Sequence, residues 1–329
     1  MADVIGAVGV PTVELRSTRL RHRFPFLGVD NEAVGRLVAS HFLDRGFRNF
    51  ALYDLDIEEY FEQRWASFVQ MIEAAGYSVS IHRAPGHRER PRDWERHQSQ
   101  LSRWLRELPK PVGLMACTDQ LGFWLLDACN RAQIAVPEAV AVVGVEDDET
   151  LCLVSSPPMS SVRFNAERTG FQAGALLDSM MSGKKPPRKP LLIPPLGIST
   201  RQSSEIIAID DRDLAEAVRF IRLHAGEGID VSDVLRVVPL SRSTLERRMR
   251  DVLGRSPRAE IMRVRLQLVT RLLADTDLTL ENIARRSGFQ YPQRLCEVFK
   301  QEFHQTPSQY REVLSIGDKN PEHFSANSE

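Results

Sequence analysis

The sequence predicts an α/β domain built on a doubly wound parallel sheet, followed by an all-α domain with two helix-turn-helix units. Three observations lead to this prediction. Short apolar runs alternate with amphipathic stretches from residue 11 to residue 202. Strand-like runs then disappear, and the periodic segments after residue 213 are helical. Within this second half the sequence aligns on itself after a shift of fifty residues.

Length and composition limit the class of protein. The chain of 329 residues is longer than one ordinary domain of roughly 100–200 residues, and its 42% hydrophobic and 26% charged residues are typical of folded cores. Its four cysteines are too irregularly spaced for a disulfide scaffold or a zinc site, and no apolar run approaches the roughly 18 residues of a membrane span. The first residues lack the basic segment of a signal peptide. We therefore expect a cytoplasmic protein with no metal and no cofactor.

The first half predicts strands with helices between them. Gly46, Gly76 and Gly183 mark the ends of helices, since glycine accepts the left-handed conformation found there. Continuous apolar strands alternating with helices indicate a parallel sheet that is covered on both faces. The expected strands are 12–15, 50–53, 79–82, 112–117, 140–145, 161–164 and 191–194.

The second half predicts helices, and the change in pattern sets the domain boundaries. We expect a first domain over 1–204, a linker over 205–212, a helical domain over 213–315 and a disordered tail over 316–329. The expected helices are 213–225, 231–237, 242–253, 257–274, 280–286 and 291–303.

The net charge of −1 conceals a basic region. Residues 212–312 carry 18 Lys and Arg against 14 Asp and Glu, and 242–271 carries nine arginines against three acidic residues. A basic segment of this kind is either a solvated helix face or a surface that attracts phosphates.

The fifty-residue repeat favours the second interpretation. Leu245 falls on Leu295 and Pro257 on Pro307, so each copy has a short helix, a turn, a second helix and a Ser-Pro or Thr-Pro stop. In a helix-turn-helix unit the second helix enters the major groove, whereas a plain helical bundle does not need the duplication. Arginine and glutamine make paired hydrogen bonds to guanine and adenine edges. The predicted DNA-contacting residues are Arg242, Ser243, Glu246 and Arg247 in the first copy, and Gln290, Gln293, Arg294 and Glu297 in the second.

A recognisable motif runs through the second copy and its stop. The pattern I-A-x-x-x-G-F, then F-K, then T-P-x-x-Y-R is present at Ile283, Ala284, Gly288, Phe289, Phe299, Lys300, Thr306, Pro307, Tyr310 and Arg311. On this motif, residues 231–311 resemble the DNA-binding domain of the AraC family of transcription regulators. Arg294 and Leu295 stand where that family usually has two aromatic residues, and Pro239 stands where it often has glycine. The resemblance implies sequence-specific DNA binding, and the departures leave the target sequence open.

The first domain carries no G-x-S-x-G, P-loop or H-E-x-x-H motif, so we expect no enzyme. Polar side chains instead stand outside the carboxyl ends of strands, where open α/β sheets bind ligands: Thr118 and Asp119 after one strand, Glu146 after the next. Arg64 is expected to open a helix after another strand, and Trp94 follows a polar turn. Carboxylates and a guanidinium suit the hydroxyl groups of a polyol, and a flat aromatic suits a sugar ring. Each residue alone could equally be a helix cap or part of the core.

A second resemblance extends this interpretation. The segments 29–52, 64–76, 116–149 and 160–177 resemble the effector domain of the LacI/GalR family. This implies a periplasmic-binding-protein fold of two lobes around a cleft, with Arg64, Trp94, Thr118–Asp119 and Glu146 holding the effector. Threonine replaces the family's asparagine, and glutamate replaces its aspartate. The family's first lobe begins with two further βα units, so we expect an N-terminally incomplete domain with an open sheet edge.

Together the two resemblances predict a dimeric transcription regulator controlled by a small sugar, which we expect to be a xylose-like pentose. Its partners would be promoter or operator DNA, a second copy of the chain and RNA polymerase. Arg258 and Arg263 are expected to position the protein on phosphates. Two alternatives stay open: a first domain that only dimerises and binds no sugar, and an enzyme with a DNA-binding tail.

Overall fold

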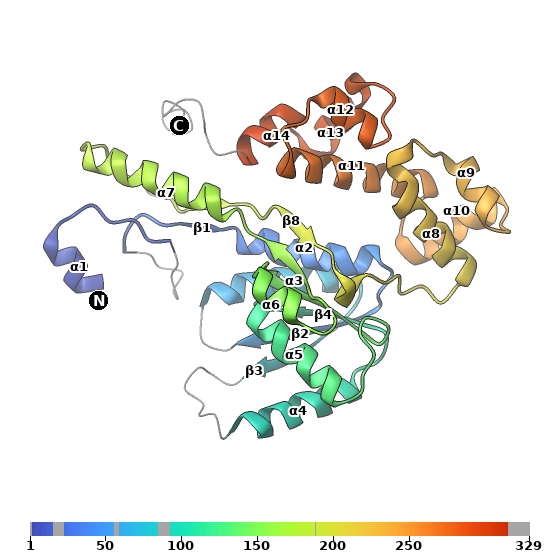
Figure 1. Cartoon of the computed structure of the whole chain (residues 1–329), viewed down its shortest axis with the longest axis horizontal. Helices are drawn as coiled ribbons and strands as arrows, with labels where there is room; N and C mark the ends of the chain where they lie inside the picture. The colour runs from blue at the N-terminus through green and yellow to red at the C-terminus, as the bar shows by residue number, and fades with distance from the viewer. Residues whose placement is uncertain (1, 16–22, 56–58, 85–92, 188, 315–329) are drawn as a thin grey trace.

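The computed structural model describes residues 2–15, 23–55, 59–84, 93–187 and 189–314. An α/β domain is followed along the chain by a helical domain (Figure 1), which confirms the predicted fold class. The tail expected over 316–329 lies outside the described residues.

The α/β domain is organised around a six-stranded sheet with the order β3-β2-β4-β5-β6-β8. The strands from β3 to β6 run parallel to their neighbours, and β8 runs antiparallel to β6. Parallel strands are covered on both faces, which accounts for the nearly continuous burial along β4 and β5. The strands are β2 (Asn49–Leu55), β3 (Val79–Ala84), β4 (Val112–Ala116), β5 (Val140–Glu146), β6 (Ser160–Arg163) and β8 (Gly197–Ser199).

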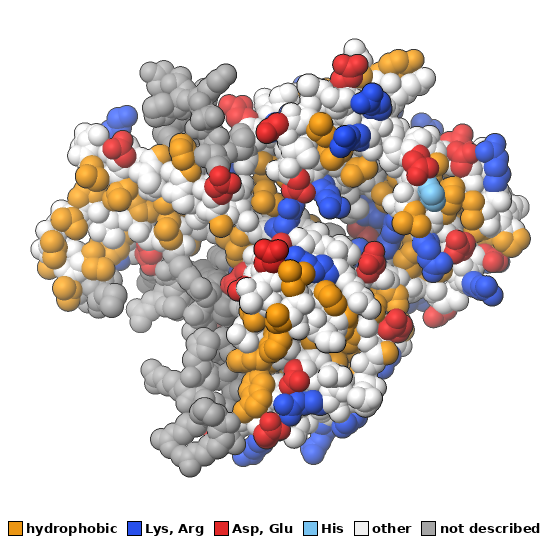
Figure 2. Space-filling view, in the orientation of Figure 1, with side chains coloured by type: hydrophobic (Ala, Val, Ile, Leu, Met, Phe, Trp, Pro, Cys, Tyr) orange, Lys and Arg blue, Asp and Glu red, His pale blue; other side chains and the backbone are white. Residues whose placement is uncertain are grey.

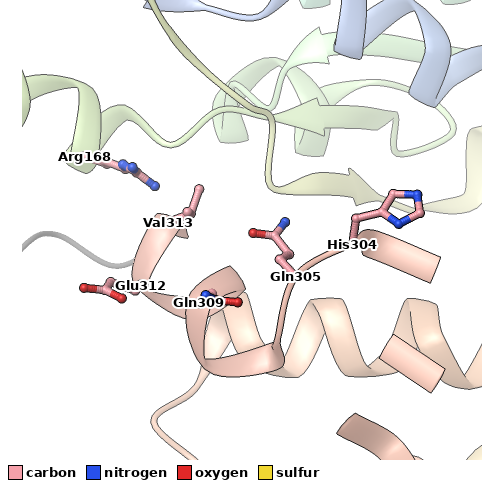
Figure 3. Close-up of a pocket in the computed structure, with 6 residues that line it drawn as sticks. All are labelled: Arg168, His304, Gln305, Gln309, Glu312 and Val313. Carbon is pink, nitrogen blue, oxygen red and sulfur yellow. The ribbon is translucent and has the colours of Figure 1, made fainter. Parts of the chain in front are cut away.

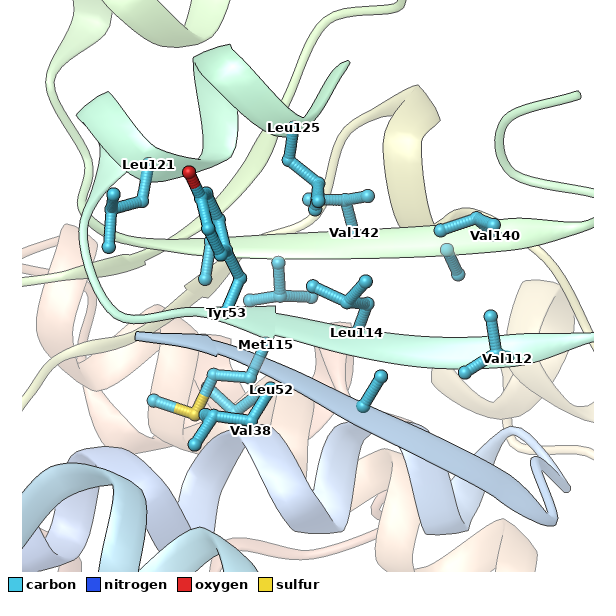
Figure 4. Packing of buried hydrophobic residues seen from close by; sticks show 14 of the residues in the cluster. Val38, Leu52, Tyr53, Val112, Leu114, Met115, Leu121, Leu125, Val140 and Val142 are labelled. Carbon is cyan, nitrogen blue, oxygen red and sulfur yellow. The ribbon is translucent and has the colours of Figure 1, made fainter. Parts of the chain in front are cut away.

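Helices cover both faces of this sheet. The helices of the domain are α1 (Ala2–Val8), α2 (Asn31–Asp44), α3 (Glu59–Ala74), α4 (Trp94–Glu107), α5 (Asp119–Arg131), α6 (Glu149–Val154) and α7 (Ala166–Met181), and those that contribute buried residues to the core around the sheet are α2 to α6. Val38 of α2 lies with Met115 on one face, and Leu125 of α5 lies with Val142 on the other (Figure 4). Successive side chains of a strand point to opposite faces, so one sheet supplies both halves of the core.

Two short strands form a separate parallel sheet: β1 (Leu27–Val29) and β7 (Leu191–Ile193). The strand expected at 12–15 is wrong, because there Glu14 makes an isolated bridge to Phe26. The other six expected strands match β2 to β7. The sequence pattern misses β1 and β8, which have three residues each.

The helical domain has two hydrophobic cores that share one helix, α11. Its helices are α8 (Arg212–His224), α9 (Val231–Val237), α10 (Arg242–Leu253), α11 (Pro257–Asp275), α12 (Leu280–Arg286), α13 (Pro292–Phe303) and α14 (Pro307–Leu314). Leu245 and Leu295, equivalent in the repeat, are each fully buried in one core. Ile261 of α11 belongs to the first core and Leu266 to the second, so α11 joins the helix-turn-helix units α9–α10 and α12–α13.

The two second helices end in the same backbone conformation with different residues. Gly254 after α10 and His304 after α13 have φ values of 69° and 55°. Glycine adopts this left-handed region without steric penalty, whereas a Cβ atom there costs about 1–2 kcal/mol.

We therefore expect His304→Gly to stabilise the helical domain by about 0.5–1 kcal/mol, after allowing for the larger entropy of glycine in the unfolded chain. The denaturant midpoint of the full chain, followed by circular dichroism, measures the change. Gly254→Ala is the matched control and should destabilise the domain. A lower midpoint for His304→Gly would contradict the argument.

Candidate effector site and DNA-binding surface

Four of the five predicted effector residues lie near the carboxyl edge of the six-stranded sheet. Thr118 and Asp119 follow β4, and Glu146 is the last residue of β5. Arg64 lies within α3, not at its start as expected, and its guanidinium reaches the end of β4. Parallel strands bring these positions together because all their carboxyl ends meet at one edge.

The Arg64 guanidinium is buried and held by the protein. Its side chain is 2% exposed, and its Nε and Nη2 atoms donate hydrogen bonds of 3.0 and 2.8 Å to Asn31 Oδ1. Its Nη1 atom donates to the carbonyl of Cys117, and its Cζ atom lies 5.7 Å from the centroid of the Phe164 ring. The sequence analysis missed Asn31 and Phe164. Phe164 ends the strand predicted at 161–164, on the same edge, and that position is the signal that could have found it.

Asp119, which follows β4, bonds to β6 and to the segment after β5. Its side chain is buried, with Oδ1 accepting from Ser161 Oγ at 2.5 Å and Oδ2 accepting from the Asp148 amide at 2.7 Å. A Cβ atom at Gly144 would lie 2.2 Å from Oδ1, so glycine is required there. Burial raises the pKa of Asp119 to about 6, although the two hydrogen bonds oppose the rise. Thr118 caps α5 by accepting from the Leu121 amide.

The turn after β5 is conformationally strained. Glu146 and Asp147 have φ values of 117° and 58°, in the region that favours glycine. Asp147 is held by Arg201 Nη1 at 2.7 Å and by Ser199 Oγ at 2.8 Å. Strain of this kind persists where the surroundings fix the backbone, and it concentrates at ligand sites.

Trp94 lies at the start of α4 and is half-buried. Its ring centroid is 5.0 Å from that of Trp124 on α5 and 5.9 Å from that of His97. Within the described part of the chain, the ring contacts of Trp94 are to these two residues and not to Arg64. The structure therefore places Trp94 beside Trp124 of α5 and His97 of α4.

The raised pKa of Asp119 predicts a pH-dependent stability. Because the native pKa of about 6 exceeds the ordinary 3.8, the folded state binds more protons between these values. The carboxyl group thus favours folding below pH 3.8, and this contribution of about 3 kcal/mol is lost as the pH rises through 6. Asp119→Asn should remove that decline, since an amide can accept from the Asp148 amide and donate to Ser161.

Urea unfolding of the full chain at several pH values between 4 and 7 measures this effect. Asp127→Asn, on the same helix but partly exposed, is the control and should keep the wild-type profile. If the free energy of unfolding falls equally with pH in the wild type and in Asp119→Asn, the pH dependence does not come from the raised pKa of Asp119.

The predicted DNA-contacting residues lie on α10 and α13 and on the turn before α13. Arg242, Ser243, Arg247, Gln290, Gln293, Arg294 and Glu297 are exposed, and Glu246 is half-buried. Tyr291, which the sequence analysis missed, precedes α13 with 59% of its surface exposed. Basic and acidic side chains are intermingled over the helical domain on the face shown in Figure 2.

The two arginines predicted to contact phosphates have different environments. Arg258 is exposed at the start of α11. Arg263 lies instead at the contact between the two domains, where it bonds Glu260 and Asp44 at 2.7 Å each. The prediction for Arg263 is wrong, because sequence proximity to the repeat did not reveal its distant partner Asp44.

A cleft lies between the two domains. It has a volume of about 470 Å³ and separates Arg168 of α7 from the end of the helical domain (Figure 3). Its other lining residues are His304, Gln305, Gln309, Glu312 and Val313. Among the described residues, no helix is both long and apolar enough to cross a membrane, and no three His, Cys, Asp or Glu are grouped to hold a metal ion.

Known proteins match both halves of this architecture. Residues 39–204 match the periplasmic binding protein-like domain family, and residues 234–312 match a helix-turn-helix domain family. The xylose operon regulatory protein of Haemophilus influenzae is 31% identical, over 88% of this chain and 75% of that protein. Its counterpart in Escherichia coli K12 is also 31% identical, over 95% of this chain and 81% of that protein. This chain belongs to the family of xylose operon regulatory proteins.

Solved structures agree with this membership. A xylose-binding transcription activator superposes with a TM-score of 0.58 and 29% identity, covering 95% of this chain and 84% of that chain. A periplasmic-binding-protein/LacI-type regulator from Alkaliphilus metalliredigens shares the fold of the α/β domain, with a TM-score of 0.53 at 14% identity. Like the other xylose operon regulatory proteins, this chain is a DNA-binding transcription regulator with an AraC-type helix-turn-helix domain.

For a family member that binds DNA, Arg242 and Arg258 should behave differently. Arg258→Ala should weaken binding to all duplexes alike and reduce the salt slope by about 1, because it removes a phosphate contact. Arg242→Ala should weaken binding to the preferred duplex by about 1–3 kcal/mol and reduce the sequence preference at one base pair. Fluorescence anisotropy with duplexes selected from a randomised pool measures both. A changed sequence preference in Arg258→Ala would contradict its role.

Proposed function

We propose that this chain regulates transcription in response to a small sugar, a xylose-like pentose, bound by the α/β domain at the carboxyl edge of its sheet. The observation that carries the proposal is the buried Arg64 guanidinium, fixed by Asn31 beneath the Phe164 ring. A cation held at a polar edge beside an aromatic face suits a polyhydroxylated ring. The names of the matched relatives point to the same effector.

Within this site we assign the residues two kinds of role. Arg64, Trp94 and Glu146 supply groups that contact the sugar. Thr118 and Asp119 hold the strand ends in place, because Thr118 caps α5 and Asp119 accepts from Ser161 and from the Asp148 amide.

The helical domain reads the promoter in this proposal. Residues Arg242, Ser243, Glu246 and Arg247 would enter one major groove, and Gln290, Gln293, Arg294 and Glu297 the next, about 34 Å away. We also propose that the regulator acts as a homodimer on paired half-sites and contacts RNA polymerase there. A protein that reads DNA works where the DNA is, so we place it in the cytoplasm.

One observation favours a rival function, in which the α/β domain only dimerises. Both carboxylate oxygens of Asp119 and the hydroxyl of Thr118 are satisfied by the protein itself, so neither needs a ligand.

Calorimetry of the full chain with d-xylose, l-arabinose and d-ribose separates the two functions. We expect heat with at least one pentose and a Kd raised at least about tenfold in Trp94→Ala, which corresponds to about 1.4 kcal/mol. Leu153→Ala, exposed on α6, is the control and should bind as the wild type does. No heat with any of the three sugars would favour the rival.

A further inference from the structure

Helix α2 touches the proposed effector site at one end and the helical domain at the other. Asn31, its first residue, accepts both hydrogen bonds from Arg64. Asp44, its last residue, makes ion pairs with Arg255 and Arg263 of the helical domain. A helix of 14 residues spans about 20 Å, so α2 alone covers the distance between the two contacts.

The helical domain holds an ordered group of side chains that binds the Asp44 carboxylate. Glu260, fully buried, accepts from Arg255 Nε at 2.5 Å and from Arg263 Nε and Nη2 at 2.8 and 2.7 Å. Burial alone would raise the pKa of Glu260, but the two arginines lower it to about 2. We call Arg255, Glu260 and Arg263 the arginine socket, which carries one excess positive charge.

Asp44 completes this socket. Its Oδ2 accepts from Arg263 Nη1 at 2.7 Å, and its Oδ1 lies 3.0 Å from Arg255 Nη2. Arg222 Nη2 also donates to the backbone carbonyl of Asp44 at 2.7 Å. The Asp44 side chain is only 13% exposed, so the pair is poorly screened by water and depends strongly on both partners being present.

The two ends of α2 belong to one packed unit. A Cβ atom added to Gly35 would lie 2.1 Å from Ser67 Oγ and 2.2 Å from the Arg64 carbonyl, so α2 and α3 touch through their backbones. Arg64 lies on α3, so the α2–α3 unit contains both Arg64 and Asp44. The backbone of Arg45, next to Asp44, also accepts from the Ala208 amide at 2.8 Å, which holds the chain leading into the helical domain.

We propose that Asp44, seated in the arginine socket, is the positioning residue that transmits effector occupancy to the DNA-binding domain. Sugar at Arg64 moves the α2–α3 unit, and the carboxylate carries that movement to α11, which joins both helix-turn-helix units. This inference rests on the proposed function and adds its mode of regulation.

The test compares operator affinity with and without saturating d-xylose in the full chain, using the duplex selected from a randomised pool. Wild type should show a ratio of affinities within about 5–150-fold. Asp44→Asn should reduce this ratio below about threefold, while its calorimetric affinity for d-xylose stays within about twofold of wild type. Arg263→Gln, on the other side of the contact, should have the same effect, and the double variant should lose no more, because one contact is broken in all three.

Asp127→Asn is the matched control, since it removes a helical carboxylate paired with an arginine inside the α/β domain. It should keep the wild-type ratio. An unchanged ratio in Asp44→Asn would overturn this inference and leave the proposed function intact, and so would loss of d-xylose binding in that variant. If the wild-type chain gives no heat in calorimetry with any of the three pentoses, both this inference and the proposed function are overturned. That outcome is seen in the wild type alone, so it is distinct from a failure of the Asp44→Asn variant. Circular dichroism confirms that each variant is folded.

Discussion

The parallel alignment of β2, β4, β5 and β6 constrains everything else in the α/β domain. It brings the ends of four strands to one edge, where backbone groups and polar side chains must find partners without a further strand to supply them. Asp119 supplies two of these partners, to Ser161 and to the Asp148 amide, and Gly144 leaves room for it. The edge is therefore polar but already ordered, which is the condition a ligand site needs if binding is not to be weakened by the cost of ordering it.

Buried charge determines how the two domains meet. Glu260 is excluded from water and remains ionised because two arginines surround it, and these arginines in turn form ion pairs with Asp44 of the other domain. Removing one member of such a group leaves an uncompensated charge, which costs about 3–5 kcal/mol. An apolar contact of the same size could slide, whereas this one has a defined geometry and can distinguish one position of α2 from another.

The duplication in the helical domain has a mechanical consequence. Each helix-turn-helix unit has its own core, and α11 belongs to both. The spacing of α10 and α13 is thus fixed by one continuous helix of 19 residues, and a contact made on α11 reaches both units together. The socket residues Glu260 and Arg263 lie on this helix, so the sensor contacts the one element that orients both recognition helices.

Features that depend on neighbouring residues in the chain could be predicted from the sequence. The 3.6-residue period and the fifty-residue repeat located Leu245, Leu295 and the helices around them, and apolar runs located six of the eight strands in the part of the chain that the structure describes. Glycines at helix ends, such as Gly46 and Gly76, have the positive φ their position required. Motifs at 231–311, and at 29–52, 64–76, 116–149 and 160–177, indicated the families of the two domains.

The pairing of polar groups could not be predicted in this way, because folding brings together residues that are far apart in the chain. Arg263 pairs with Asp44 across 219 positions, Asp119 with Ser161 across 42, and Arg64 with Asn31 across 33. The periodicity of apolar residues cannot predict such contacts, because a charged side chain has the same place in the sequence pattern whether it faces water, a phosphate or a buried carboxylate. Its role follows from the partner that folding places beside it, and burial then makes that partner indispensable.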